Sequence, residues 1–178
     1  EYLRKKKEKI NFCIVGEPTN PKKLGEMIKI GRRGSLSAKL EISGTQGHVA
    51  YPHLSNNPIN ALIAICKKLK DLKLDGGNKN FQPSNLELTS IYVDNKAHNV
   101  IPARARTHFN IRYNNFHTSL SLKKKINSII KNICQKSKCK FKIDYDANGD
   151  AFLTKPEKTI YMAKKIIKKI TKINPKFS

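Results

Sequence analysis

The segment from Ala103 to Tyr113 is the feature that most constrains the fold, because its residues alternate between two kinds along its whole length. Such a period of two is typical of a β-strand that buries one face and exposes the other to water. The expected buried face carries Ala105, Thr107, Phe109, Ile111 and Tyr113, and the expected polar face carries Arg104, Arg106, His108, Asn110 and Arg112.

Three further strands and two helices follow from the same kind of pattern. The strands are expected at Leu36–Ile42, Leu86–Val93 and Phe141–Tyr145. One helix is expected to start at Asn57 and Pro58 and the other at Ser119. Their apolar stripes are Ile59, Leu62, Ile63, Cys66 and Leu69 in the first, and Leu122, Ile126, Ile129, Ile130 and Ile133 in the second.

The order strand, helix, strand, strand, helix, strand predicts an α+β fold. It is the ferredoxin-like βαββαβ pattern, a two-layer sandwich in which two helices cover one face of a four-stranded antiparallel sheet. Outside it we expect a strand at Ile10–Val15, a short strand at Glu26–Ile30 and a compact basic turn at Gly31–Gly34. A third helix should begin near Lys155 and Pro156, and its stripe of isoleucines should be covered by something outside this chain.

Length and composition bound the remaining possibilities. A chain of 178 residues can bury one core, and because it begins with Glu1 rather than Met we interpret it as an excised piece. No apolar stretch is long enough to span a bilayer, so we expect no membrane partner and a cytoplasmic location. The cysteines Cys13, Cys66, Cys134 and Cys139 lack metal-binding spacing and are expected to be core thiols.

The formal net charge of +23 raises the question of nucleic acid. Lysine is spread over every predicted helix and both tails, together with abundant Ile and Asn. Aromatic residues make up only 7% of the chain and there is no Trp, so a surface for stacking bases is poorly supplied. We therefore interpret the charge mainly as compositional background, and this interpretation is favoured over nucleic-acid binding.

The fifteen residues from Gly44 to Pro58 connect a predicted strand to a predicted helix, and a loop of that length often has a function. His48, Tyr51 and His53 offer groups that donate hydrogen bonds or transfer protons. A histidine in a glycine-containing loop is more often an ordinary surface residue, however, and the loop alone favours that interpretation. For Glu17, in the turn Gly16-Glu17-Pro18, the sequence alone likewise favours an ordinary solvated side chain.

Four motifs in the same order resemble the M20 family of two-zinc amidohydrolases. They are Gly16-Glu17-Pro18, then Gly31-Arg32-Arg33-Gly34-Ser35, then Gly44-Thr45-Gln46-Gly47-His48-Val49-Ala50-Tyr51-Pro52-His53, and Asn99-Val100-Ile101-Pro102. The resemblance covers about Phe12 to Thr154. In this family a ferredoxin-like lid, which also forms the dimer, is inserted into a zinc-bearing catalytic domain.

The resemblance implies a division of the chain and a partner. Residues 1–33 and 147–178 would be flanking pieces of the catalytic domain, and residues 34–146 would be the lid. The lid implies a homodimer. Glu17 would be a zinc ligand, but the family's other ligands are absent from this chain, so we expect the isolated piece to bind zinc no better than micromolar and to be inactive.

The resemblance is strongest to members that hydrolyse an N-succinyl amide, which implies a small substrate with several carboxylates. His48 would be catalytic, reaching from the partner subunit to donate a hydrogen bond to the oxyanion. The residues implied to bind substrate are Arg32, Arg33, Ser35, Tyr51, Asn99 and Arg112. His98 stands where Asn commonly precedes Asn99.

Three other interpretations remain open on the sequence alone. The first is the lid of another M20 deacylase, of the acetylornithine deacetylase or aminoacylase type. The second is a basic ferredoxin-like module that binds RNA, although Ala103–Tyr113 contains no glycine and carries cations and His where such a strand presents aromatic residues. The third is a dimerisation module with no chemistry of its own.

Overall fold

The computed structural model describes residues 5–6, 8–10, 13–17 and 20–178. Its contacts divide the chain into two compact units. One unit is Gly31–Thr154, and the other combines Glu1–Ile30 with Lys155–Ser178. The first unit extends a little beyond the predicted lid at both ends, and the lid boundaries at residues 34 and 146 stay a prediction.

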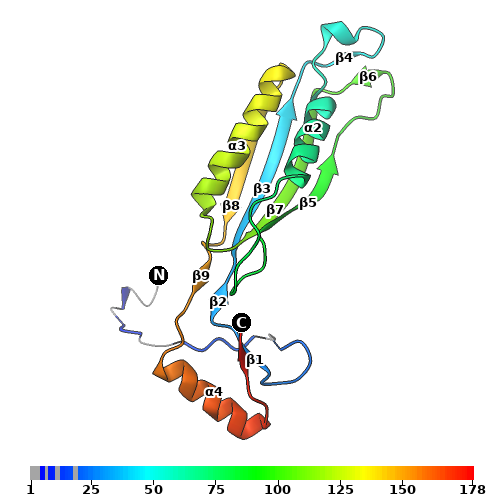
Figure 1. Ribbon diagram of the computed structural model, residues 1–178. Coiled ribbons are helices and arrows are strands. Elements are labelled where there is room, and N and C mark those ends of the chain that lie inside the picture. Colours follow the sequence, from blue (N-terminus) through cyan, green and yellow to red (C-terminus); the bar gives the residue numbers. More distant parts are fainter. Residues whose placement is uncertain (1–4, 7, 11–12, 18–19) are drawn as a thin grey trace. The chain divides into compact units, whose positions relative to one another are not determined.

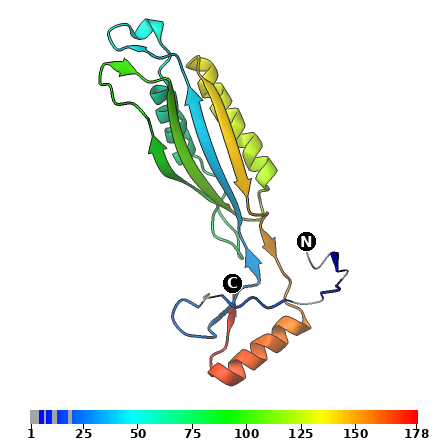
Figure 2. The ribbon, with the colours of Figure 1, turned by 180° about the vertical axis from the view of Figure 1, so that it is seen from behind.

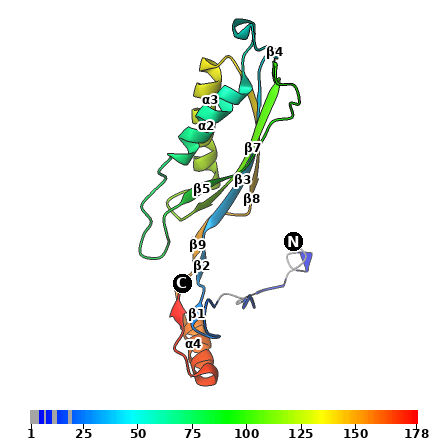
Figure 3. The ribbon, with the colours of Figure 1, turned by 90° about the vertical axis from the view of Figure 1, so that its right-hand side faces the viewer.

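The larger unit is built on a four-stranded sheet whose strands are β3 (Gly34–Ser43), β5 (Asn85–Tyr92), β7 (Arg104–Tyr113) and β8 (Lys140–Ala147). The strand order is β5-β7-β3-β8, and every neighbouring pair is antiparallel. Helices α2 (Pro58–Lys70) and α3 (Ser119–Lys136) lie on one face of this sheet (Figures 1 and 3). The predicted ferredoxin-like sandwich is thereby confirmed.

The core lies between the sheet and the two helices. The faces of β3 and β7 that alternation predicts to be buried are buried: Phe109 is 1% exposed, and Ile111 and Tyr113 are 0% exposed. The corresponding face of β8, with Phe141, Ile143 and Tyr145, is partly buried against this core. Seen from behind, the other face of the sheet carries no helix (Figure 2). Along β3 the buried side chains are Leu36, Ala38, Leu40 and Ile42, and those that α2 and α3 contribute are Ala61, Leu62, Ile65, Cys66, Leu69, Leu122, Ile126, Ile130 and Cys134.

Both helices begin at the side-chain caps that their sequences require. The Asn57 side chain accepts a hydrogen bond from the Ile59 N–H, and Pro58 occupies the first turn of α2, as predicted. Thr118 caps α3 in a capping box with Ser121. One stripe residue was assigned wrongly: Ile63 is 61% exposed, because α2 turns that position away from the sheet.

Short strands extend the larger unit at both ends of the sheet. They are β2 (Gly31–Arg32), which pairs with β9 (Phe152–Leu153), and β4 (Gly47–His48), which pairs with β6 (Val100–Ile101). A 3₁₀ turn, η1 (Pro52–Leu54), follows β4. The prediction of a compact turn at Gly31–Gly34 was wrong, because a partner strand far along the chain draws Gly31 and Arg32 into extended backbone.

The smaller unit contains α4 (Lys158–Thr171) and a parallel pair of strands, β1 (Met27–Ile28) and β10 (Lys176–Phe177). The predicted short strand and third helix are therefore present. The prediction of a strand at Ile10–Val15 is wrong for residues 10 and 13–15, which are exposed and belong to no strand. Residues 11–12 of that segment, and Pro18 of the turn that follows it, lie outside the described residues. Among the described helices, none is long and apolar enough to cross a membrane.

Candidate functional site

The predicted site residues of the larger unit fall into two groups at opposite ends of the sheet. The ten residues of β3 span about 30 Å at roughly 3.3 Å per residue. Ser35 pairs with Arg112 near the start of β3, and Ser43 pairs with Arg104 at its end. We call the first region the arginine end, with Arg32, Arg33, Ser35 and Arg112, and the second the loop end, with His48, Tyr51 and Asn99.

The loop end is held together mainly by backbone hydrogen bonds. β4 pairs with β6, and the Val49 N–H donates to the Asn99 carbonyl at 3.1 Å. The Thr45 and Asn56 backbones exchange two further bonds, so the loop closes on itself before α2 begins. These contacts bring the predicted Asn99 beside the His48 loop, although the two segments are distant in sequence.

His48 is exposed at this end, and its ring orientation is set locally. Its Nδ1 accepts a hydrogen bond from the Ala50 N–H at 3.1 Å. In the neutral ring, the hydrogen is then carried by Nε2, which becomes an outward donor. The Tyr51 ring centroid lies 6.1 Å from that of His48, and Tyr51 is 58% exposed. Two groups that can donate hydrogen bonds therefore stand together on an exposed loop.

At the arginine end, backbone pairing and side-chain bonds gather the cations. Arg112 pairs with Ser35 on one side and with Asn85 on the other. The Arg33 guanidinium donates to the Asn85 side-chain oxygen at 3.2 Å, and the Ser35 hydroxyl accepts from Asn110 at 3.3 Å. Arg112 is exposed, whereas Ser35 is 4% exposed and fixed within the sheet.

The sequence reasoning missed a carboxylate, Asp75, that supports this end. One of its oxygens accepts from the Asn114 amide at 2.6 Å and from the Gly77 N–H at 2.7 Å, and the other lies 3.1 Å from His117 Nε2. Burial alone raises the pKa of Asp75, but hydrogen bonds from the Ser84 hydroxyl and from these donors outweigh it and lower the pKa to about 2. Asp75 thus ties the loop before β5 to the end of β7.

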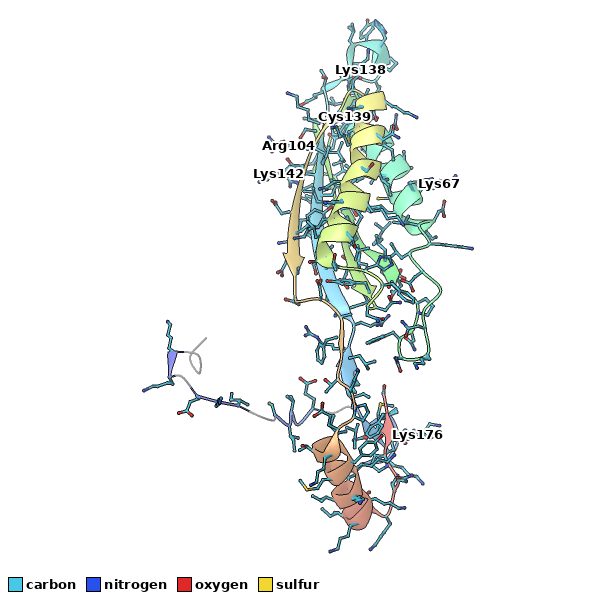
Figure 4. All side chains as sticks on the ribbon, turned by 60° about the vertical axis from the view of Figure 1, so that its left-hand side comes forward. Lys67, Arg104, Lys138, Cys139, Lys142 and Lys176 are labelled. Carbon is cyan, nitrogen blue, oxygen red and sulfur yellow. The ribbon has the colours of Figure 1, made fainter. Side chains whose placement is uncertain are left out.

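The open face of the sheet between the two ends is polar. Glu41 accepts a hydrogen bond from Arg106 at 2.6 Å and lies 4.0 Å from Arg104, and the bond from Arg106 lowers the pKa of Glu41. Figure 4 shows Arg104 and Lys142 on the side of the sheet opposite to Lys67 of α2. Within β3 and β7, all of whose residues are described, Phe109 and Tyr113 are buried under the helices, so these two strands offer no aromatic platform to RNA.

A hollow of about 260 Å³ lies beside the loop end, where the open face meets the segments around β6. It is lined by Gln46, Tyr92, Asp94, Asn95, Pro102, Ala103, Arg104 and Arg106. None of the predicted site residues lines it. The hollow therefore does not join the two ends of the sheet into one binding site.

Glu17, the predicted metal ligand, is exposed and belongs to no strand. Among the residues that the structure describes, no group of three His, Cys, Asp or Glu side chains could hold a metal ion. Three of the cysteines are buried, but Cys13 is exposed, so the expectation of a core thiol is wrong for Cys13. Burial raises the pKa of Cys134 to about 11 and also raises the pKa of Cys66 and of Cys139, which suits core thiols rather than metal ligands.

Comparison with known proteins identifies the larger unit. Residues 30–138, more than half of the chain, match the M20 peptidase dimerisation domain. The whole chain is 62% identical to a succinyl-diaminopimelate desuccinylase of Pelagibacter ubique and 47% identical to one of Rickettsia bellii, and it covers 46% of the length of each. The chain thus spans about half the length of the curated relatives it matches.

Solved structures agree on the fold. An aminopeptidase of Bacillus cereus superimposes with a TM-score of 0.69 at 11% identity, covering 85% of this chain and 39% of that protein. A tripeptidase of Staphylococcus aureus gives a TM-score of 0.68 at 14% identity, covering 84% and 39%. At such identities these structures speak for the architecture alone.

Proposed function

Because this chain belongs to the family of M20 peptidase dimerisation domains, we propose that it is the lid and dimerisation segment of a succinyl-diaminopimelate desuccinylase. The 62% identity over all 178 residues to a relative of that name is the observation that carries the proposal. The complete enzyme would hydrolyse N-succinyl-LL-2,6-diaminopimelate to succinate and LL-2,6-diaminopimelate, a step of lysine biosynthesis. Water adds to the amide carbonyl, the C–N bond breaks, and the amine leaves with a proton.

The arginine end supplies what a substrate with several carboxylates needs. A guanidinium binds a carboxylate through two parallel hydrogen bonds, and this end of the sheet carries three arginines. Arg112 is exposed on the open face of the sheet. Arg32, the residue that precedes Arg33, is exposed as well. In the proposed enzyme these side chains bind the carboxylates of the substrate, while Ser35, fixed inside the sheet, keeps Arg112 in register.

The loop end supplies the donor for the developing oxyanion. His48 Nε2 is free to donate because Nδ1 is engaged by the Ala50 N–H, and Tyr51 and Asn99 stand nearby for contacts with substrate. The length of β3, about 30 Å, keeps this donor from a small ligand held by Arg112 of the same chain. His48 therefore acts in the active site of a partner subunit. This arrangement is favoured because His48 and Arg112 lie at opposite ends of the same sheet.

A two-fold dimer through one sheet edge makes that reach possible. β5 is an edge strand, and α2 packs beside it. Exposed apolar side chains occur on both elements: Ile63 is 61%, Ile91 63% and Tyr92 53% exposed. An unpaired edge beside exposed apolar surface is a template for its own symmetry mate. We assign the homodimer interface to the edge formed by β5 and α2.

Hydrolases of this family are generally metal-dependent, and zinc is the metal we propose for the complete enzyme. It would supply the attacking hydroxide. Glu17 alone does not make a site, and the described residues offer no cluster to join it. In the proposed enzyme the other ligands come from outside this chain. The isolated chain should accordingly bind zinc no better than micromolar in calorimetry and should not hydrolyse the substrate.

A chimera tests the proposed activity. This chain replaces the matching 178 residues of the Pelagibacter ubique relative, so that the missing half of the enzyme is supplied. The zinc-loaded chimera should release succinate from N-succinyl-LL-2,6-diaminopimelate at a rate near that of the parent relative, and should do so faster than from N-acetylornithine. A folded, zinc-loaded chimera without desuccinylase activity contradicts the proposal, and a preference for N-acetylornithine favours the acetylornithine deacetylase type.

Sedimentation of the isolated chain tests the interface. The chain should dimerise at high micromolar concentration, and Ile63→Glu should weaken the dimer by at least tenfold. Leu120→Glu is the matched control, because Leu120 is also 61% exposed but lies on α3, beside the opposite edge. A dimer that Leu120→Glu disrupts and Ile63→Glu does not would place the interface at the β8 edge instead.

A further inference from the structure

The short turn that follows β8 is tied to the arginine end by a carboxylate that the proposed mechanism does not use. Asp150 accepts hydrogen bonds from the Tyr113 hydroxyl at 2.7 Å and from the Ser119 N–H at the start of α3 at 2.8 Å. The Tyr113 hydroxyl also lies 3.3 Å from the Gly149 carbonyl oxygen. One carboxylate thus joins three segments: the end of β7, the start of α3 and the turn at 148–150.

The same turn contacts the Arg32 guanidinium. Arg32 Nη2 donates to the Asn148 carbonyl at 2.5 Å, and the Asn148 N–H donates to the Ser35 carbonyl at 3.0 Å. Gly149 has φ +81°, and a Cβ there would lie 3.3 Å from Arg32 Nη2. The turn therefore passes close along the guanidinium, and its backbone position sets where the Arg32 side chain lies.

We propose that Tyr113 and Asp150 are positioning residues that fix the 148–150 turn so that the Asn148 carbonyl orients Arg32 toward a substrate carboxylate. The inference rests on the proposed function for the identity of that carboxylate. An arginine has five N–H donors in one plane, so one bond to a fixed carbonyl sets the direction of the other four. An exposed arginine without this support would lose rotamer freedom on binding, at a cost in affinity.

The chain offers a variant that removes the support and little else. The Tyr113 ring is fully buried, and a Cβ on Gly34 would lie 2.3 Å from it, so the ring fills its place completely. Tyr113→Phe keeps the ring and deletes only the hydroxyl. Tyr145→Phe is the matched control: its hydroxyl donates to Asn127 at 2.9 Å, on α3, and Tyr145 lies mid-sheet opposite Ala38.

The first measurement uses the 178-residue chain and does not depend on activity. The order of each arginine side chain is read from the relaxation of its Nε–Hε group by NMR, with the exposed Arg112 as an internal reference. Arg32 should be more ordered than Arg112 in the parent chain, and should become as mobile as Arg112 in Tyr113→Phe and in Asp150→Ala. Tyr145→Phe should leave Arg32 ordered. If Arg32 keeps its order in Tyr113→Phe and in Asp150→Ala, the positioning role is overturned, whatever happens to thermal stability.

The second measurement uses the chimera with the Pelagibacter ubique relative. Tyr113→Phe should raise KM about 3- to 10-fold, the equivalent of immobilising one long side chain, with kcat within twofold. Tyr145→Phe should change neither constant. An unchanged KM in Tyr113→Phe overturns the link to substrate binding. A parent chimera with no desuccinylase activity instead counts against the proposed function, while the NMR result still decides whether Tyr113 and Asp150 orient Arg32.

Discussion

The two ends of the sheet are stabilised by different kinds of interaction. The loop end is closed by backbone pairs such as Val49 with Asn99, and by the neutral Asn95 amide, which donates to the Val100 carbonyl at 2.9 Å. The arginine end is tied by two carboxylates, Asp75 and Asp150, each of which accepts hydrogen bonds from more than one segment.

The difference follows from what each end would have to do. A donor that enters the active site of another subunit needs a free side chain on a shaped loop, and backbone bonds shape the loop without engaging His48 Nε2. Arginines that bind a charged substrate need fixed directions, and charge-assisted bonds to a carboxylate fix the surrounding loops more strongly than neutral ones do. Changes at the loop end should therefore affect chemistry, whereas changes at the arginine end should affect stability and substrate affinity.

The largest expected effect is that of His48→Ala in the chimera. If His48 donates to the oxyanion in the neighbouring active site, kcat should fall about 100- to 1000-fold, roughly 3 to 4 kcal/mol of barrier, with little change in KM. Zinc content and dimerisation should be unchanged, because the His48 side chain is exposed. Steady-state kinetics and metal analysis measure both.

His53→Ala is the control for this loop. His53 is also exposed and its neighbour Tyr51 has a ring centroid 6.4 Å away, but His53 has no assigned part in the reaction. It should leave kcat within a few-fold. If kcat for His48→Ala is also within a few-fold of the parent, His48 is an ordinary surface histidine. The loop end would then have no part in the chemistry that distinguishes it from the arginine end.

The next effect is on folding at the arginine end. A Cβ on residue 34 would lie 2.3 Å from the buried Tyr113 ring, so Gly34→Ala must displace that ring and the bond it makes to Asp150. We expect it to lower the free energy of unfolding by about 3 kcal/mol, the upper part of the usual range for overpacking. Gly76→Ala is the control, because nothing lies within 4 Å of a Cβ there. Urea unfolding that ranks the two variants equally would show that the Tyr113 ring is not closely packed.

Acid should weaken the same end through Asp75. Its pKa is lowered in the folded chain to about 2 from an ordinary value of 3.8. Because the folded chain has the lower carboxyl pKa, ionised Asp75 stabilises the fold at pH values above 3.8, the ordinary pKa of the group. This stabilisation is lost as the pH falls from about 4 to about 2. The shift in pKa corresponds to about 2 kcal/mol in the free energy of unfolding. In Asp75→Asn this part of the pH dependence should disappear. Unfolding measured between pH 5 and pH 2 checks it, and parallel curves for parent and variant would contradict it.

The sequence predicted the fold well because the fold depends on local periods. Alternation at β3, β7 and β8, the cap at Asn57 and the helix start at Ser119 each involve residues within a few positions of one another. The Gly44–Pro58 loop was also found from its own residues. Ile63 was misassigned because a helical stripe does not say how wide the covered face is.

The support of the arginine end could not be predicted, because it is made across long sequence separations. Tyr113 and Asp150 are 37 residues apart, and Asn114 and Asp75 are 39 apart. Neither pair has a periodic or motif signal, and Asp75 stands before two glycines, which indicates only a loop. The pairing of β2 with β9 escaped prediction for the same reason, and it turned an expected loop at Gly31 and Arg32 into a strand.

The smallest expected effect is at the loop end and measures how much a side chain contributes there. The Asn57 side chain accepts a hydrogen bond from the Ile59 N–H at 2.9 Å and caps α2 directly after the loop. Asn57→Ala should cost about 1 kcal/mol of stability, the usual value of a lost N-cap, and Asn57→Ser should recover most of it. In the chimera, kcat and KM should stay within about twofold, because the backbone bonds that shape the His48 loop remain. A kcat that falls tenfold or more in Asn57→Ala and recovers in Asn57→Ser would mean that the cap, rather than the backbone pairing of β4 with β6, sets the position of His48, and the contrast between the two ends would then be wrong.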